Sequence, residues 1–326
     1  MQRRVADLNR FRGCLLGLAV GDALGTTVEF HSRGTFPPLT DIVGGGPFRL
    51  APGEWTDDTS MALCLAASLV ELGVFDPRDQ IERYCRWRED GYQSSNGRCF
   101  DIGRTVAAAL ERYRQTGECL AGSTDPQAAG NGCIMRLAPV PMFYFPDETD
   151  AKWYAGESSR TTHGAEECIE ACRLLAGMIC RALGGADKEE VLLGDIGVSL
   201  GRSPVSAIAR GEYRSLLEDD IRGSGYVVAS LQAAAWCFAQ TDSYEAAVLR
   251  AANLGDDADT TAAVCGQLAG AFYGEGGIPA RWLATLAKRR EIATLAEGLS
   301  AHRRNVPDAG QPNPPPDQLL DGNEVV

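Results

Sequence analysis

Histidine is scarce in this sequence, in which 326 residues include only His31, His163 and His302. These residues lack the spacing of zinc ligands, and none of the 11 cysteines forms a CxxC pair, so a zinc site is not expected. The odd number of scattered cysteines is typical of reduced, mostly buried thiols. It therefore favours a cytoplasmic protein.

Basic residues are also in deficit, with 31 Lys and Arg against 44 Asp and Glu and a net charge of −13. Because phosphate backbones bind to basic faces, nucleic acid is not an expected partner. No secretory signal is visible. The most apolar stretch, residues 13–30, is short for a membrane span and carries Asp22 and Glu29, so no membrane association is expected either.

Strands with alternating apolar and polar residues are missing, and helical patterns dominate. Asp76 and Pro77 form a typical helix start. We predict helices over 59–73, 76–90, 101–117, 164–183, 225–240, 243–255, 260–274 and 280–304. Gly/Pro-rich loops are predicted over 31–54, 91–100, 121–133 and 145–163. The expected fold is all-α, a compact single-domain bundle of many helices over 1–304, with a disordered Pro- and Asp-rich tail over 305–326.

Glycines recur every fourth residue at Gly13, Gly17, Gly21 and Gly25. On a helix this spacing makes a smooth stripe that another helix can approach closely. In a membrane such a stripe suggests dimerisation, whereas in a soluble chain it indicates tight packing in the core. We expect the second, and expect the protein to be a monomer.

Two acidic clusters stand directly before apolar helices. The first is "WTDDT" and the second is "GDDADTT"; their Asp and Thr oxygens are Thr56, Asp57, Asp58, Asp257, Asp259 and Thr260. Capping is one interpretation, because Asp and Thr are common N-caps. One cap does not need several neighbouring carboxylates, however, and hard oxygen donors suit Mg²⁺, Mn²⁺ or Ca²⁺. Two such clusters could hold two ions about 3.5–4 Å apart.

Five motifs in order resemble the ADP-ribosylglycohydrolases from about residue 11 to 290: "GCLLGLAVGDALGTTVEF", "WTDDT", "GNGCIMRLAPV", "THG" and "LGDDADTTAAVCGQLAGAFYG". The stretch "GRCFDIGRTV" (97–106) is similar to the bacterial dinitrogenase reductase-activating branch. The resemblance implies an all-α hydrolase with two Mg²⁺ or Mn²⁺ ions. In that branch it removes ADP-ribose from an arginine guanidinium of a modified protein, and ADP-ribose is the product.

The resemblance also implies roles for individual residues. The Asp and Thr residues of the two clusters become the metal ligands. Asp256 has no assigned role and lies behind the ligands or in solvent, and Asp22 is structural or supports the ligands from behind. Asp101 and Glu29 become the catalytic carboxylates, although Asp101 could instead cap the helix that follows it. The implied substrate contacts are Gly130, Asn131, Gly132 and Met135 around the ribose and phosphates, His163 at the diphosphate and Tyr213 in the cleft.

Each substrate contact has a plainer interpretation. The Gly-rich segment could be an ordinary turn, His163 a cap or core residue, and Tyr213 an exposed tyrosine beside an arginine. The leading function is hydrolysis of ADP-ribosyl-arginine. The alternatives are a hydrolase for another linkage (serine, a nucleobase or a small guanidine) and a non-catalytic protein that binds ADP-ribose or neutralises a transferase.

Overall fold

The structure is a computed structural model that describes residues 7–193 and 203–302. Within these ranges it forms helices and no named strand. The α-helices are α1 (Leu8–Gly25), α2 (Asp57–Leu72), α3 (Pro77–Asp90), α4 (Arg104–Thr116), α5 (Pro139–Tyr144), α6 (Glu148–Arg160), α7 (Glu166–Leu183), α8 (Lys188–Leu192), α9 (Pro204–Ala209), α10 (Val227–Ala239), α11 (Tyr244–Ala252), α12 (Ala258–Tyr273), α13 (Ala280–Thr285) and α14 (Arg289–His302). The expectation of an all-α fold is confirmed.

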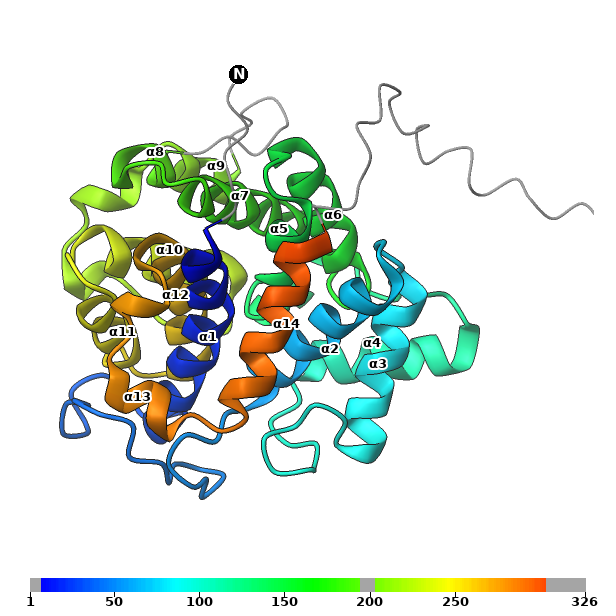
Figure 1. Cartoon of the computed structure of the whole chain (residues 1–326), viewed down its shortest axis with the longest axis horizontal. Helices are drawn as coiled ribbons and strands as arrows, with labels where there is room; N and C mark the ends of the chain where they lie inside the picture. The colour runs from blue at the N-terminus through cyan, green and yellow to red at the C-terminus, as the bar shows by residue number, and fades with distance from the viewer. Residues whose placement is uncertain (1–6, 194–202, 303–326) are drawn as a thin grey trace, which may run out of the picture.

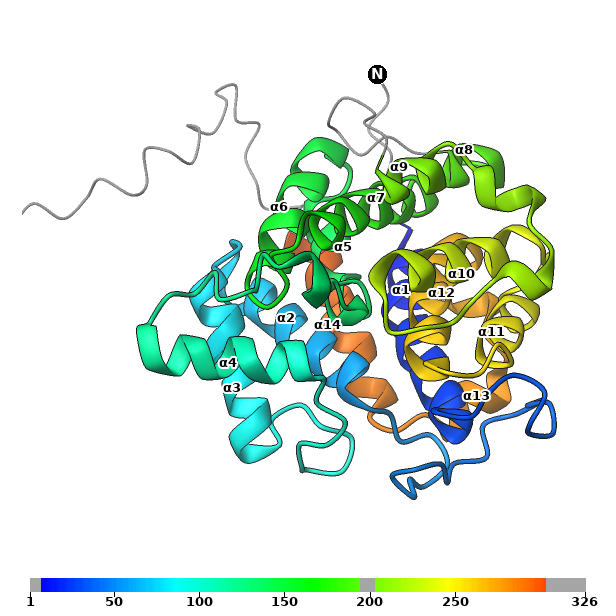
Figure 2. The same ribbon diagram turned by 180° about the vertical axis from the view of Figure 1, so that it is seen from behind.

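Helix α1 lies near the middle of the bundle. Figure 1 shows α10, α11 and α12 on one side of it and α14 and α2 on the other, with α3 and α4 at the outer edge. Helices α5 to α9 cross the remaining end, as the view from behind also shows (Figure 2). A single continuous core of buried apolar side chains joins these helices.

The glycine stripe of α1 packs against α12. A methyl group on Gly13 would overlap the carbonyl oxygen of Gly270, and one on Gly25 would overlap that of Ala258. The two helices therefore run antiparallel with their backbones in close contact, which explains why larger residues are excluded there. The C-terminal end of α1 is thereby held against the N-terminal end of α12, and tight core packing is the correct interpretation of the stripe.

Two sequence-based predictions are wrong. Residues 145–163 were expected to be a loop, but they contain α6, whose N-cap Asp147 accepts hydrogen bonds from the backbone N–H groups of Thr149 and Asp150, both 3.0 Å. The stretch 280–304 was expected to be one helix, but it is divided into α13 and α14. The break is fixed by tertiary contacts, since the Ala287 N–H donates to the Gly53 carbonyl oxygen (2.9 Å).

Three further predictions concern the cysteines, membrane-spanning segments and the C-terminal tail. All 11 cysteines are free, nine buried and two partly buried, as the composition predicts. No described helix combines the length and apolar character needed to cross a bilayer. The proposed tail over 305–326 lies outside the described residues.

Candidate active site and metal centre

The site forms where the C-terminal end of α1 meets the first turns of α2 and α12. Asp57 and Asp58 begin α2, and Asp259 is in the first turn of α12. Glu29 follows α1 and a short 3₁₀ turn, and only 3% of its surface is exposed. The antiparallel contact of α1 with α12 therefore brings carboxylates more than 200 residues apart in the chain into one buried cluster.

Capping does not explain these carboxylates. The N-cap residues of α2 and α12 are Thr56 and Asp257, and neither side chain makes a capping hydrogen bond. The start of α2 is instead capped from α1: Asp22 accepts from the backbone N–H groups of Thr56 (2.9 Å) and Thr59 (3.0 Å). Because these amides already have a partner, Asp57 and Asp58 are not needed as caps.

The two helix starts contact each other directly. Thr56 Oγ1 lies 3.3 Å from Asp58 Oδ2 and 3.3 Å from Asp259 Oδ2. Thr260 Oγ1 of α12 lies 3.3 Å from the same Asp58 oxygen. Each hydroxyl has one proton and cannot satisfy several carboxylate oxygens, so the arrangement leaves acceptors in excess. Oδ1 of Asp58 and Oε2 of Glu29 are buried without a hydrogen-bond partner.

Two overlapping groups of carboxylates have oxygens close enough to share a cation. In each group one oxygen per residue lies within 4.8 Å of the others; the groups are Asp22, Asp58, Asp259 and Glu29, Asp101, Asp259. Asp259 belongs to both groups. The geometry thus contains two adjacent places for a cation, joined by one residue.

Burial and mutual repulsion raise the pKa values of this cluster. The pKa values of Asp57, Asp58 and Asp259 are well above the usual range for aspartate, mainly because of burial and also because of neighbouring carboxylates. Glu29 has a pKa of about 9, with burial as the main cause and the charge of Asp101 next. No basic side chain is among the main influences on these pKa values in the described residues. The cluster is therefore a set of crowded acidic groups that no basic side chain among the described residues balances, so each group holds its proton more tightly than usual.

Asp101 does not cap α4. That helix begins at Arg104, its N-cap is Gly103, and no side chain caps it. Asp101 lies before it with a backbone φ of 60°, a conformation that aspartate adopts only occasionally. Burial and the charge of Asp22 raise its pKa to about 8. The structure thus removes the capping alternative and directs this carboxylate toward Glu29 and Asp259.

The segment 130–136 lies beside the second cluster. Asn131 donates from Nδ2 to Asp257 Oδ2 at 2.9 Å, and its own N–H donates to the Gly225 carbonyl oxygen. A methyl group on Gly132 would contact the His163 ring at 2.8 Å. The loop is therefore attached to α12 on one side and rests on His163 on the other.

His163 lies behind this loop, with 1% of its surface exposed. Its Nδ1 is 2.8 Å from Thr162 Oγ1, and burial lowers its pKa to about 4. The ring is therefore neutral at physiological pH. This placement favours support of the loop over direct contact with a diphosphate.

Met135 and Tyr213, the other two implied substrate contacts, are both buried. Met135 is 3% exposed, and its carbonyl oxygen faces Gln267 of α12. Tyr213 lies in the 3₁₀ turn η4 (Glu212–Ser215) with 0% of its surface exposed. A fully buried ring does not line an open cleft, and it is not the exposed tyrosine of the alternative interpretation either.

Two residues near the cluster have positions that the motifs do not specify. Asp22 caps α2, and one of its carboxylate oxygens is also within 4.8 Å of the oxygens of Asp58 and Asp259. Tyr226 precedes α10, forms a backbone bridge with Gly130 and is 42% exposed. A tyrosine directly after Gly225 and before an apolar helix is a weak signal, and it did not single this residue out.

Asp256 has a backbone conformation that Asp257 and Asp259 do not share. It is partly exposed, has a backbone φ of 55°, and its backbone N–H donates to the His31 carbonyl oxygen (2.7 Å). Its backbone thus ties the loop after α1 to the start of α12. Neither Asp256 nor Asp257 is in either group of closely spaced carboxylates.

Comparison with known proteins agrees with this geometry. The sequence profile of the family described as ADP-ribosylglycohydrolase matches residues 3–309. The chain is 48% identical to the ADP-ribosylarginine hydrolase Tri1 of Pseudomonas putida over 90% of this chain and 78% of that protein. It is 33% identical to the ADP-ribosyl-[dinitrogen reductase] glycohydrolase of Rhodospirillum rubrum, over 90% and 96% of the two chains.

A solved structure has the same fold. It is described as an ADP-ribosylglycohydrolase-related protein complex, and it matches with a TM-score of 0.80 and 45% identity over 90% of this chain and 98% of that one. The helical fold and the relatives are those of a glycohydrolase enzyme. The chain belongs to the ADP-ribosylglycohydrolase family, and the resemblance inferred from its motifs is confirmed.

Proposed function

We propose that this enzyme removes ADP-ribose from arginine side chains of modified proteins, in a reaction that depends on two divalent cations. The observation that carries the proposal is the buried carboxylate cluster in a chain 48% identical to a protein named ADP-ribosylarginine hydrolase. A substrate of this kind leaves ADP-ribose and an unmodified arginine as products.

The donor set fits Mg²⁺ or Mn²⁺. Oδ1 of Asp58 is a buried acceptor without a partner, and a cation would satisfy such an atom. Carboxylate and hydroxyl oxygens are the ligands these ions prefer. The residues proposed to hold them are those of the two helix starts: Thr56, Asp57, Asp58, Asp257, Asp259 and Thr260. When bound, the ions would orient the ribose hydroxyls and offset the local negative charge.

Proton transfer falls to the carboxylates at the edge of this cluster. Hydrolysis adds water to the anomeric carbon of the ribose, and the electron pair of the broken C–N bond goes to the guanidine nitrogen, which takes up a proton. Asp101 is the group proposed to give this proton, because its carboxyl lies at the edge of the cluster and burial raises its pKa to about 8 in the metal-free protein. Glu29 is the other group placed to exchange a proton, because its carboxylate lies close to both Asp101 and Asp259.

The loop at Gly130, Asn131 and Gly132 is proposed to receive the ribose and phosphates, together with Met135. Glycines allow backbone N–H groups to approach an anion closely. His163 supports this loop from behind. The exposed ring of Tyr226, paired with Gly130 through the backbone, is the aromatic group best placed to stack on the adenine, a role for which Tyr213 is too deeply buried.

The test is turnover with defined linkages. Purified protein would be incubated with peptides carrying ADP-ribose on arginine, serine or aspartate, with and without added Mg²⁺ or Mn²⁺. We expect release of ADP-ribose from arginine only, and only with metal. Release from serine alone would establish the other-linkage alternative, and tight ADP-ribose binding without turnover would establish a binding or transferase-neutralising protein.

The same preparation tests the remaining expectations. Gel filtration with light scattering should show a monomer. A chain ending at residue 304 should retain turnover, because the proposed domain ends there. A location in the cytoplasm, consistent with the 11 free cysteines, is checked by fractionation of the source cells.

A further inference from the structure

Three phenylalanines lie in a row beside the catalytic carboxylates. The ring centroids of Phe30 and Phe48 are 6.5 Å apart with planes at 71°, and those of Phe48 and Phe100 are 5.4 Å apart with planes at 50°. Phe30 is 69% exposed, whereas Phe48 and Phe100 are partly buried. We call Phe30, Phe48 and Phe100 the aromatic strip. It joins three segments that are distant in sequence.

Both ends of the strip are covalently attached to the site. Phe30 directly follows Glu29, and Phe100 directly precedes Asp101. Glu29 and Asp101 are the residues whose carboxylate oxygens lie within 4.8 Å of each other and of Asp259. The strip is therefore carried by the same two segments that carry these carboxylates, Phe48 lying between its two ends.

The backbone holds the exposed end of the strip in an unfavourable conformation. Phe30 has a φ of 65°, which is rare for a bulky side chain, and its N–H donates to the Asp256 carbonyl oxygen at 2.7 Å. An exposed ring on a strained backbone gains little from folding, since it buries only a small part of its apolar surface in the chain. Such strain is typical of positions that serve binding or catalysis.

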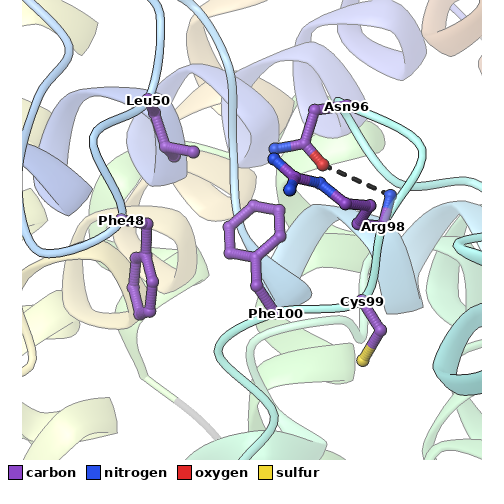
Figure 3. A pocket seen from close by; sticks show the side chains of 6 residues that line it. All are labelled: Phe48, Leu50, Asn96, Arg98, Cys99 and Phe100. Carbon is purple, nitrogen blue, oxygen red and sulfur yellow. Dashed lines mark hydrogen bonds between the residues drawn. The ribbon is translucent and has the colours of Figure 1, made fainter.

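The other end of the strip lines an open pocket. Figure 3 shows Phe48 and Phe100 on the wall of this pocket, with Leu50 above them and Arg98 beside Asn96. The Asn96 side-chain oxygen accepts a hydrogen bond from the Arg98 backbone N–H at 3.3 Å, which fixes the turn before Phe100. The pocket is thus lined by the segment that leads directly into Asp101.

We propose that the aromatic strip receives the arginine side chain that carries ADP-ribose, and so helps to select the linkage that is cleaved. This inference rests on the proposed function. A guanidinium is a planar cation on an apolar stem. Aromatic faces attract such cations and cover the stem, and a carboxylate beside them completes the recognition.

The carboxylates alone cannot provide this selectivity. If the ions and Asp259 hold the ribose, the leaving group must lie on the side of Glu29 and Asp101, and the strip is the surface that continues from there. A serine-linked substrate has neither the cation nor the stem. The strip should therefore contribute to binding of arginine-linked substrates and not to binding of ADP-ribose.

The test compares Phe48→Leu with wild type. Phe48 is not adjacent in sequence to a catalytic residue, and leucine retains apolar volume but removes the aromatic face. We expect KM for an arginine-linked peptide, and the inhibition constant of free arginine as product, to rise by about 2- to 30-fold, as loss of a cation–π contact predicts. The kcat value and the Kd for ADP-ribose should be unchanged.

Controls separate the possible failures. Phe36→Leu changes a phenylalanine of the same loop outside the strip, and its KM should match wild type. Phe30→Leu provides a second variant if Phe48→Leu has a lowered melting temperature. Unchanged KM in both strip variants would overturn the inference, as would an equal loss of ADP-ribose affinity, which would place the adenine on the strip. A wild type inactive on arginine linkages would instead refute the proposed function.

Discussion

Two kinds of helix start in this chain carry aspartate, and they use it differently. In α3, Asp76 accepts hydrogen bonds from the backbone N–H groups of Arg78 (2.8 Å) and Asp79 (3.3 Å), and it lies near the surface. In α2, Asp57 and Asp58 make no capping hydrogen bond, although both are buried. Aspartate is thus the N-cap of α3, whereas in the first turn of α2 it caps nothing and is buried among other carboxyl groups.

The difference arises from the neighbouring helix. The amides at the start of α2 donate to Asp22 of α1, so Asp57 and Asp58 are not needed as caps. Burial of a carboxylate without a partner costs free energy, and a folded protein tolerates that cost where a bound ligand offsets it. A carboxylate that neither caps nor pairs is therefore better evidence for a cation site than the presence of aspartate alone.

The largest effect should come from the residue shared by both carboxylate groups. Asp259→Ala should abolish measurable turnover, because it removes an oxygen donor from both proposed cation positions. Asp256→Ala, next to the cluster but in neither group, is the matched control and should retain most activity. Steady-state assays with saturating Mg²⁺ measure both. Equal losses would show that the ligands are assigned in the wrong register.

The next effect concerns Asp101. Asp101→Asn retains the shape but removes the titratable proton, and turnover of ADP-ribosyl-arginine should fall by roughly 10²–10⁴-fold. Because Asp101 caps no helix, the melting temperature should be largely retained. Single-turnover kinetics beside a thermal melt check this. Near wild-type turnover of Asp101→Asn would indicate that Glu29 and not Asp101 transfers the proton.

The stability of the metal-free protein should depend on pH because of the buried carboxyl groups of the cluster. The folded-state pKa values of Glu29 (about 9) and Asp101 (about 8) are raised. Between the unfolded and folded pKa values the native state binds more protons than the unfolded state, so the free energy of unfolding falls as pH rises. The melting temperature without metal should therefore be lower at about pH 8 than at about pH 5.

Added Mg²⁺ should oppose this fall of the melting temperature with rising pH. A cation that binds only the folded protein stabilises it, and it competes less with protons at the higher pH. The melting temperature should therefore rise more with Mg²⁺ at the higher pH than at the lower. A metal-free melting temperature that is flat or increases over this range would contradict the account of unpaired carboxylates.

The smallest effect should come from a true cap. Asp76→Ala should cost about 0.5–2 kcal/mol of stability through loss of the two capping hydrogen bonds of α3. It should leave metal binding and turnover unchanged, since Asp76 lies outside both carboxylate groups. Chemical denaturation and the steady-state assay measure the two properties. A change in metal affinity would mean that the two kinds of helix start are not distinct.

Local signals in the sequence were sufficient for much of the fold. Asp76 and Pro77 mark the start of α3, and Gly73 and Gly117 follow α2 and α4 in the left-handed conformation that glycine favours. The break between α13 and α14 could not be predicted in this way. It depends on the hydrogen bond from Ala287 to Gly53, which is a contact between distant parts of the chain.

The candidate site, like the fold, could be predicted only in part from local sequence. The Asp and Thr motifs at the two helix starts are visible in the sequence, and so is their likeness to metal ligands. The capping of α2 by Asp22 and the position of Asp101 ahead of α4 are not, because both depend on how α1, α2 and α4 pack. Choosing Tyr213 rather than Tyr226 shows the same limit, since only the structure reveals which ring is exposed.

The most direct test of the central claim is the number of Mn²⁺ ions that the folded protein binds. Equilibrium dialysis gives the stoichiometry, and electron paramagnetic resonance detects whether the bound ions are coupled, as ions about 3.5–4 Å apart would be. We predict two coupled ions per chain in wild type and in Asp76→Ala, and loss of the coupled pair in Asp259→Asn. Binding of no ion, or an unchanged coupled pair in Asp259→Asn, would contradict the assignment of these carboxylates as metal ligands.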